Sequence, residues 1–416
     1  MRAAGIIRQM RQMRLMGQIG LMRRMSLIGL IGLMGVSLTA CTPEPPLHLY
    51  DSVNGTIIIP GPKIELDVVW DYEIAYDVHY DWRAEWYYGW DDHDRSIWGE
   101  MGYTDPTKFY MRRYYSGDIP YGPHMLVLSP DAFYGNSYQG KFEWGYWDLL
   151  VYNEPQVDVL SIHFDESDPE NIIAYTNPSM YRSRYQAPRF TNSFYSPEPL
   201  FSVYEQAIDI NSDLRGFIYD EVRNLYIRQL ELVLLPVTYI YLTQVILHNN
   251  RERVTGVDGV SNLSGMARTV CLQSQRAGSD AITVNYTCVM KKNVPYISYD
   301  KTPTEAEKEA AEKVDIIGGQ LMTFGMCDLR ANSLTKANEV KDKYHHYIDV
   351  NMQFNNGMDS TFVFDVTDQV RKRYKGGVLT IELDMDTIPI PTRKGGSGFD
   401  AVVQDFEDGG THEFEM

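Results

Sequence analysis

The chain has 416 residues, 44% of them hydrophobic, and its 38 basic and 56 acidic side chains give a formal charge of −18. This hydrophobic fraction is enough to bury a core, which excludes an acidic disordered tail, and the length predicts about two or three domains. The acidic balance argues against a nucleic-acid-binding protein, because such a protein needs a basic surface to displace counterions from phosphate.

The first forty residues differ in charge from the rest of the chain. They contain six arginines and no acidic residue, so removing them takes the formal charge from −18 to −24. From Met22, a short basic stretch precedes an apolar run, and small residues then precede a cysteine. This order is typical of an export signal. The apolar run is shorter than the ~20 residues that a membrane-spanning helix needs.

The sequence LTAC at residues 38–41 resembles the bacterial lipobox. The resemblance implies that Cys41 is acylated, becomes the first residue of the mature protein and is held at the outer membrane by its acyl chains. The alternative is an ordinary cleaved signal with a chance cysteine. We assign residues 1–40 to a lipoprotein signal peptide and residues 41–62, which begin with a proline-containing polar stretch, to a tether and first strand.

Most of the mature chain has the pattern of β-strands. Alternating or short apolar runs predict strands over residues 64–69, 124–128 (expected to be buried), 157–162, 227–235, 237–247, 347–354, 360–366, 378–383 and 413–416. Pro236 indicates a break between two of these strands. The sequence NNG at residues 355–357 predicts a hairpin. Short strands separated by Gly, Pro and Asn favour an all-β fold of antiparallel β-sandwiches.

One short helix and one domain boundary interrupt this pattern. Thr302-Pro303-Thr304-Glu305 predicts a capping box with proline at the first helical position, and hence a solvated helical insertion near residues 303–313. A polar, proline-containing stretch ends near residue 200. We therefore expect an aromatic-rich N-terminal β-sandwich over residues 63–196 and a C-terminal β-sandwich over residues 197–416.

Aromatic residues are concentrated in one segment. All seven tryptophans lie between positions 70 and 147. The period-two spacing of apolar residues from Tyr72 to Trp82 favours the face of a buried sheet. The alternative is an exposed platform for sugar rings, for which the candidates are Trp82, Trp86, Tyr87 and Trp90.

Two polar clusters could suggest metal binding, and neither predicts a metal site. The sequence DDHD at residues 91–94 lacks the spaced oxygens and the glycine of a calcium loop, so a solvated acidic turn is the preferred interpretation. His345 and His346 are adjacent, so on a strand they point to opposite faces, and we expect surface or edge residues.

Three cysteines remain in the mature chain after Cys41. Cys271 and Cys288 flank a predicted hairpin turn at residues 277–280, which leaves a cross-strand disulfide open. The alternative is that these two cysteines and Cys327 are three free, buried thiols. We prefer this alternative.

The sequence contains none of the catalytic motifs that mark common enzyme classes. There is no G-x-S-x-G, H-E-x-x-H, P-loop or dinucleotide-binding pattern. A glycosidase-like carboxylate pair stays open, because nothing marks which acidic residues would form it. We predict no enzyme activity and no cofactor.

Five short motifs occur in order in the second half of the chain: NLSGMA at 262–267, GQLMTFG at 319–325, FDVTDQV at 364–370, IPIP at 388–391 and GGSGFD at 395–400. Together with the lipobox, they resemble the fimbrillin-like surface lipoproteins of Bacteroidales, in the type V pilin superfamily. The resemblance implies two tandem transthyretin-like β-sandwiches and a cell-surface location. It also implies partners, namely fimbrial subunits joined by β-strand addition.

The sequence departs from the pattern of shaft subunits, which are processed at an early arginine. After Cys41 the first basic residue is Lys63 and the first arginine is Arg83. This favours a retained lipid anchor. We therefore predict a non-catalytic, membrane-anchored anchor or accessory subunit of fimbriae, or an adhesin. The alternative is a carbohydrate-binding surface lipoprotein that binds glycans through its tryptophan-rich segment.

Overall fold

The computed structural model describes part of the chain. The described residues are 50–51, 56–57, 63–70, 82–135, 137–155, 161–180, 193–210, 216–222, 225–298, 303–327, 345–392 and 402–403. The chain divides into two compact units, residues 1–60 and residues 61–416. In the first unit, β1 (Tyr50–Asp51) pairs antiparallel with β2 (Thr56–Ile57). The predicted acylation site Cys41 and the predicted last strand at 413–416 lie outside the described residues.

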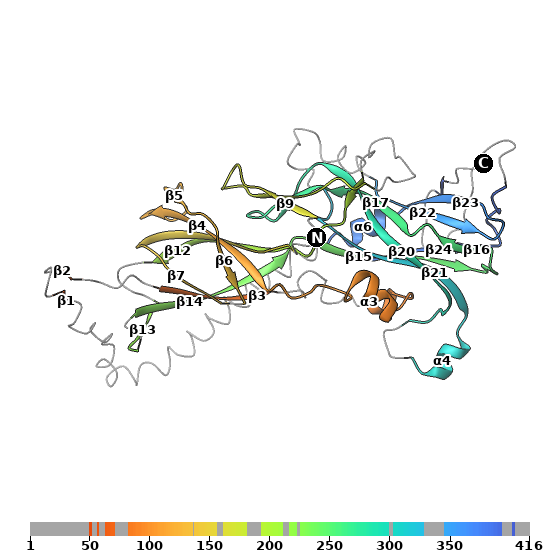
Figure 1. The fold of residues 1–416 in the computed structure, drawn as a ribbon, viewed down its shortest axis with the longest axis horizontal. Helices are drawn as coiled ribbons and strands as arrows, with labels where there is room; N and C mark the ends of the chain where they lie inside the picture. Colours follow the sequence, from red (N-terminus) through yellow and green to blue (C-terminus); the bar gives the residue numbers. More distant parts are fainter. Residues whose placement is uncertain are drawn as a thin grey trace, which may run out of the picture. The chain divides into compact units, whose positions relative to one another are not determined.

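The larger unit begins with a nine-stranded sheet, here called the N-terminal sheet, in the order β5-β4-β8-β12-β14-β3-β7, with β13 on β14 and β6 on β4 (Figure 1). Its strands are β3 (Lys63–Trp70), β4 (Lys108–Gly117), β5 (Leu126–Val127), β6 (Asp131–Tyr134), β7 (Ser137–Lys141), β8 (Gly145–Asn153), β12 (Phe201–Ile210), β13 (Ile218–Asp220) and β14 (Leu225–Pro236). All these pairs are antiparallel except β3 with β14.

The N-terminal sheet folds over itself to enclose a core. β12 and β14 pair only at Phe201–Ser202 and Leu235–Pro236, so the two halves of the sheet diverge beyond that point. Side chains of β4 and β8 from one half pack against Leu232 and Leu234 of β14 from the other. Two halves that share one apolar interior form a β-sandwich.

A ten-stranded sheet, here called the C-terminal sheet, follows in the order β24-β15-β21-β20-β17-β22-β23-β25, with β11 on β20 and β16 on β22. Its strands are β11 (Ser193–Tyr195), β15 (Tyr239–His248), β16 (Val254–Val257), β17 (Val260–Ala267), β20 (Ala281–Pro295), β21 (Lys313–Thr323), β22 (Tyr347–Phe354), β23 (Asp359–Asp365), β24 (Gly377–Asp384) and β25 (Val402–Val403). Helix α6 (Thr367–Lys372) connects β23 to β24.

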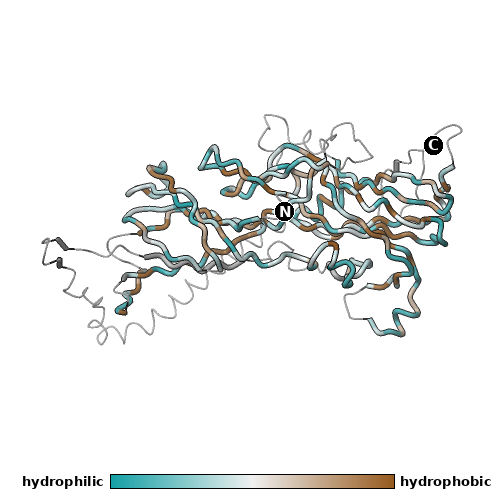
Figure 2. The backbone as a smooth tube through the Cα atoms, in the orientation of Figure 1, coloured by the Kyte–Doolittle hydropathy of each residue, from teal (hydrophilic) through white to brown (hydrophobic). Residues whose placement is uncertain are grey.

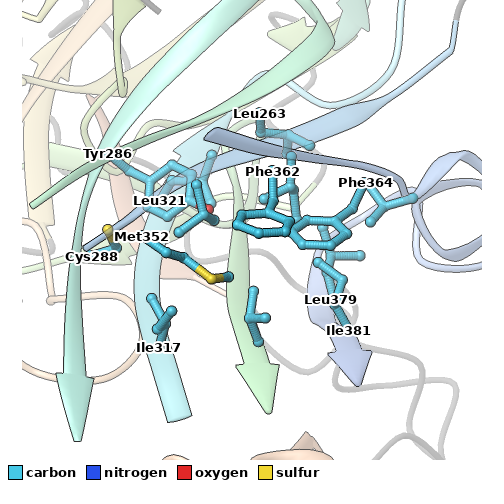
Figure 3. Packing of buried hydrophobic residues seen from close by; sticks show 14 of the residues in the cluster. Leu263, Tyr286, Cys288, Ile317, Leu321, Met352, Phe362, Phe364, Leu379 and Ile381 are labelled. Atoms are coloured by element: carbon cyan, nitrogen blue, oxygen red, sulfur yellow. The ribbon is translucent and has the colours of Figure 1, made fainter. Parts of the chain in front are cut away.

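The strand β20 takes part in both halves of the C-terminal sandwich. Its first residues pair with β17 and its last residues with β21. Between the halves, Tyr286, Leu321, Phe362 and Leu379 belong to one buried cluster (Figure 3). Hydrophobic residues lie along the strands of this sheet, whereas α4 (Glu305–Ala310) is mainly hydrophilic (Figure 2).

A third, four-stranded sheet has the order β19-β18-β10-β9. It is built from β9 (Ile162–Asp165), β10 (Ile173–Thr176), β18 (Thr269–Cys271) and β19 (Arg276–Ala277), so it combines two hairpins far apart in the sequence. Its side chains share a buried cluster with Leu150 and Tyr152 of β8 and with Phe324, which follows β21. This cluster therefore joins the N-terminal and C-terminal sheets.

The structure confirms the all-β prediction and most of the predicted strands. β3, β14, β15, β22, β23 and β24 lie where the apolar patterns place them, and the hairpin between β22 and β23 turns at the predicted NNG sequence. One predicted strand differs in burial. Met125 and Leu126 in the predicted buried run at 124–128 are exposed, because β5 is a two-residue strand at the end of its sheet.

The strand pairing does not follow the predicted boundary at residues 196–197. β12 and β14, which come after this boundary, pair with β8 and β3 of the N-terminal sheet. β11, which precedes it, pairs with β20 of the C-terminal sheet. The changeover between the sheets lies between Pro236 and Tyr239, where hydrogen bonding passes from β14 to β15.

The helical insertion begins two residues later than predicted. The N-cap of α4 is Thr304, which accepts a hydrogen bond from the Glu307 N–H, and the Glu307 carboxylate accepts one from the Thr304 N–H. The sequence from Thr304 to Glu307 has the same Thr-x-x-Glu spacing as the predicted box, so both registers satisfy the capping pattern. Pro303 thus lies before the helix.

Candidate functional site

The aromatic segment that the sequence marks as a candidate platform lies on the outer face of the C-terminal sheet. It contains α2 (Trp82–Glu85) and α3 (Asp92–Trp98). Trp86 and Tyr88 share a buried cluster with Ile240, Leu242 and Ile246 of β15. The segment therefore covers β15, a strand that begins about 150 residues later in the sequence.

The structure separates the four candidate platform residues. Trp86 is only 2% exposed and its indole N–H donates to the Gly89 carbonyl oxygen at 2.8 Å, so it is a core residue and the platform prediction is wrong for it. Tyr87 and Trp90 are half-buried. Trp82 lies in α2, and its side chain is outside the described part of the structure. Residues 71–81, where the sequence predicts a buried sheet face, are likewise not described.

Tyr87 and Trp90 each lie against one other aromatic ring. The Tyr87 ring centroid is 4.6 Å from that of Tyr296, and the Trp90 centroid is 5.4 Å from that of Trp98. The Trp98 indole N–H donates to the Thr287 carbonyl oxygen of β20 at 3.2 Å. Two half-buried ring pairs on one face could stack on sugar rings.

An ion pair fixes this segment to the sheet. The Lys291 ammonium of β20 lies 2.5 Å from Asp94 Oδ2 and 2.8 Å from Asp91 Oδ2. Lys291 Nζ also lies 4.2 Å from the centroid of the Tyr88 ring, and the Tyr88 hydroxyl donates to Asp94 Oδ1 at 3.2 Å. Paired and hydrogen-bonded on both oxygens, the fully buried Asp94 carboxylate keeps its charge satisfied.

The two aspartates at this point also begin α3. The Asp91 side chain accepts from the backbone N–H groups of His93 and Asp94, and the Asp94 side chain accepts from the Asp91 N–H. The hydrogen bond from Lys291 lowers the pKa of Asp91 to about 2. Burial, followed by the charge of Asp94, raises the pKa of the Tyr88 hydroxyl.

The DDHD sequence is therefore a helix cap and ion-pair site, and the predicted solvated turn is wrong for its Asp94. Sequence reasoning missed Lys291 as the partner, because nothing at Lys291 marks it and 197 residues separate it from Asp94. The one signal that could have identified the helix cap is the capping-box spacing from Asp91 to Asp94. The same acidic residues also fit a solvated turn, so the cap is not recognised from the sequence.

The described cysteines are free thiols. Cys271 pairs across β18 and β19 with Arg276, whereas Cys288 of β20 faces Gly319. The turn that follows Cys271 thus lies at residues 272–275 and does not bring the two cysteines together, so the disulfide alternative is not formed. Cys288 is buried, and its sulfur lies 3.0 Å from the Ser261 hydroxyl. Burial raises the pKa of Cys288 to about 11.

The two adjacent histidines differ in environment. His345 is exposed, but His346 is only 1% exposed, so the prediction of a surface or edge residue is wrong for His346. Its Nδ1 lies 3.2 Å from the Ser264 carbonyl oxygen, and its backbone N–H donates to the Thr367 hydroxyl at 2.9 Å. Burial lowers the pKa of His346 to about 4. The residue therefore joins β17 and α6 as a neutral side chain.

A second polar cluster holds the loop between β4 and β5. The buried Asp148 of β8 accepts hydrogen bonds from the Tyr204 hydroxyl at 2.8 Å and the Ala207 N–H at 2.7 Å. His124 Nε2 lies 3.0 Å from Asp148 Oδ2, and His124 Nδ1 lies 3.1 Å from Glu170 Oε1. No sequence pattern identifies these residues as a group, because they come from four separate segments.

Four of the five family-like motifs lie in described parts of the C-terminal sandwich, and the fifth, at 395–400, lies outside the described residues. Gly265 of the first motif has φ +81°, and a Cβ there would lie 2.5 Å from the His345 carbonyl oxygen. In the third motif, Gln369 exchanges hydrogen bonds with the backbone of Thr380 in β24. Pro391 of the fourth accepts from the Asn356 amide at 2.6 Å. These residues set backbone geometry.

Neither a metal site nor a membrane span is found in the part of the chain that the structure describes. There is no group there of three or more His, Cys, Asp or Glu side chains that could hold a metal ion. None of the helices described has the length and apolarity needed to span a bilayer.

Comparison with known proteins finds similarity only to solved structures, at low sequence identity. No protein-family model and no curated protein sequence matches it. A candidate adhesin from Bacteroides ovatus is 14% identical with a TM-score of 0.44, over 79% of this chain and 95% of that one. A polysaccharide-binding candidate from Bacteroides thetaiotaomicron is 7% identical with a TM-score of 0.37, over 78% and 91%.

The fimbrial anchor protein Mfa2 from Porphyromonas gingivalis is 6% identical with a TM-score of 0.36, over 77% of this chain and 90% of that one. At these identities and TM-scores, the three structures are only proteins to which this chain is similar.

Proposed function

We propose that the protein is a membrane-anchored, fimbrillin-like surface lipoprotein, an anchor or accessory subunit of fimbriae or an adhesin, without catalytic activity. The observation that carries the proposal is the order of the chain. A lipobox-like LTAC sequence and a polar tether precede an all-β unit whose first strand, β3, begins at Lys63. This order is suited to holding a rigid β-domain at a membrane.

The position of β3 supports a retained anchor. β3 lies inside the N-terminal sheet, parallel to β14 over residues 63–70 and antiparallel to β7 over residues 63–67. The first arginine after Cys41, Arg83, comes only after this strand. With β3 in place, the sheet keeps its own strand. The ends of the sheets, at β5, β7 and β24, are the candidate edges for strand addition by a fimbrial subunit.

Acylation tests the anchor. Cells grown with an alkyne-tagged fatty acid should label the wild-type protein at Cys41 and leave Cys41→Ala unlabelled. Cys41→Ala should leave the membrane fraction, whereas Cys271→Ala, which removes a cysteine of the folded domain, should stay there. Equal membrane retention of Cys41→Ala and wild type would contradict the acyl chains as the sole anchor. Co-purification with fimbrial subunits in detergent tests the fimbrial part of the proposal.

A second candidate function, glycan binding, is favoured by the half-buried ring pairs of Tyr87 with Tyr296 and Trp90 with Trp98. On a glycan array, Trp90→Ala should lose saturable binding if these rings form the site. Tyr134→Ala, which removes an exposed ring in β6, is the matched control. Binding that survives Trp90→Ala and Tyr87→Ala would remove this candidate. Trp86→Ala is unsuitable, because Trp86 is a core residue.

A further inference from the structure

Exposed hydrophobic side chains gather at one end of the N-terminal sheet. The structure describes ten large hydrophobic side chains as exposed, and six of them, here called the apolar tip, are Ile119 (61%), Tyr121 (75%), Met125 (75%), Leu126 (47%), Ile218 (70%) and Val222 (96%). Both segments that carry them, around β5 and β13, include hydrophobic stretches in Figure 2. These side chains come from two segments on different halves of the sheet, and exposed apolar side chains concentrated at one end of a domain mark an interaction surface.

Strand directions show that these side chains share one end. β12 runs away from its junction with β14, and β14 runs back toward it, so Ile210 and Leu225 lie at the same end of the sheet. Ile210 pairs with Gly145 of β8, where β4 also ends, and the loop with Ile119 and Tyr121 follows β4. Val222 lies in the turn that joins β13 to the start of β14.

The tether enters the unit at this same end. Lys63, the first residue of β3, pairs with Ile227 near the start of β14. Lys63 lies 22 residues after Cys41. A chain of that length limits the distance between Cys41 and Lys63 to roughly 75 Å at full extension. A domain held at Cys41 therefore keeps its apolar tip near the bilayer at a high effective concentration.

The loop that carries Tyr121 is held in a fixed shape. The Gly122 N–H donates to the Ile119 carbonyl oxygen at 3.2 Å, which closes a turn with Pro120 at its second position. Tyr121 has φ +56°, a backbone conformation that costs glycine or asparagine less conformational energy than tyrosine. Residues in such strained conformations cluster at functional sites.

The base of the loop is fixed as well. The Met125 N–H donates to the Tyr115 carbonyl oxygen at 2.7 Å, and His124 lies between the carboxylates of Asp148 and Glu170. A loop that is already ordered loses little conformational entropy when it meets a surface.

We propose that the apolar tip inserts into the interfacial layer of the membrane that holds the acyl chains, and so orients the domain on the bilayer. The proposal rests on the lipid anchor proposed above. Tyrosine favours the membrane interface, and the aliphatic side chains beside it can be buried at the boundary between headgroups and acyl chains. Asp118, Glu143 and Glu221 are exposed acidic residues around the tip, so zwitterionic lipid should be preferred to anionic lipid.

Quenching by brominated lipid tests the insertion. The full acylated protein is reconstituted in phosphatidylcholine vesicles with or without bromine on the acyl chains. Tyr121→Trp should lose roughly half of its added emission to the bromine, because interfacial side chains lie about 5–10 Å deep. Tyr134→Trp, the matched control, should lose none. Adding Met125→Ser and Leu126→Ser to Tyr121→Trp should abolish the quenching, with circular dichroism showing an unchanged fold.

The outcomes separate the tip from the anchor. Acylated protein in which Tyr121→Trp and Tyr134→Trp are quenched equally would overturn the tip and leave the anchor standing. Absence of fatty acid on Cys41 would overturn the anchor, and quenching of Tyr121→Trp by added vesicles would then still support the tip. Shielding of Tyr121→Trp by a co-purifying protein, without bromine quenching, would overturn the membrane as the occupant.

Discussion

Replacing Asp94 with alanine should detach α3 from the C-terminal sheet. The change removes the carboxylate that contacts Lys291 at 2.5 Å and accepts from the Tyr88 hydroxyl and the Asp91 N–H. A seven-residue helix is not stable by itself in water, so α3 depends on these contacts. Its loss would also remove Trp98, which packs against the buried cluster formed by Trp86, Tyr88 and residues of β15.

The magnitude follows from burial. Breaking a buried ion pair costs about 3–5 kcal/mol. Lys291 keeps Asp91 at 2.8 Å and is 19% exposed, so the lower end, about 3 kcal/mol, applies. At ~2.1 cal/mol/K per residue over roughly 350 residues, this lowers the midpoint of two-state unfolding by about 4 °C.

Asp92→Ala is the matched control, because Asp92 lies in the same helix, is fully exposed and pairs only with the exposed Arg95 among the described contacts. It should leave the stability close to that of the wild type. Thermal unfolding followed by circular dichroism gives the midpoints, and hydrogen exchange should show faster exchange at residues 91–99 in Asp94→Ala alone. Equal midpoints for the two variants would refute the assignment of Asp94 as the residue that fixes α3.

Three further predictions concern buried groups of the C-terminal half. The pKa of His346 is about 4 in the folded protein and about 6.5 in the unfolded chain. Its contribution to stability is therefore complete above pH ~6.5 and is lost as the pH falls toward 4. Urea unfolding between these pH values should show that His346→Asn loses up to about 3 kcal/mol less stability than the wild type as the pH falls. Gly265→Ala should cost about 2–4 kcal/mol, because its new Cβ meets a carbonyl oxygen at φ +81°, whereas Gly357→Ala at φ +76° in open space should cost about 1 kcal/mol in thermal unfolding. Because burial raises the pKa of Cys288 to about 11, iodoacetamide at pH 8 should alkylate the half-buried Cys271 well before Cys288 in the native protein, and equal rates by peptide mass spectrometry would count against this burial.

The sequence was sufficient for the strands because their signal is local. Period-two alternation over β3 and the NNG turn between β22 and β23 are set by neighbouring residues, and the structure reproduces both. The all-β class follows from the same patterns. Whether a strand at the end of a sheet is buried depends on distant segments of the chain. This is why Leu126 of β5 is exposed although its local sequence predicts burial.

The arrangement of the strands could not be predicted in the same way. β14 belongs to the N-terminal sheet because it pairs with β3, a partner more than 150 residues earlier in the chain. The proline-rich stretch near residue 197 resembles a domain linker in composition, yet it joins two strands whose neighbours lie in different sheets. Pairing between distant segments has no signature in either segment alone.

The candidate platform shows the same limit for single residues. Trp86 and Trp90 are four positions apart in one aromatic-rich stretch, and composition does not distinguish them. The structure buries Trp86 against β15 and leaves Trp90 half-buried. The motifs behind the family resemblance are likewise informative about the fold, since Gly265 and Gln369 set backbone geometry and carry no ligand chemistry.

The path of β3 connects the proposed anchor to the rest of the unit. A pull applied at Cys41 reaches the larger unit at Lys63, the first residue of β3, and its component along β3 loads the hydrogen bonds of that strand. Parallel hydrogen bonding to β14 runs over eight residues and antiparallel bonding to β7 over five, so the load falls on both rows of bonds together, in shear. A strand at the end of the sheet and pulled sideways would lose its bonds one at a time. An anchored adhesive protein benefits from the first geometry, because a load shared over two rows of bonds must break many of them at once.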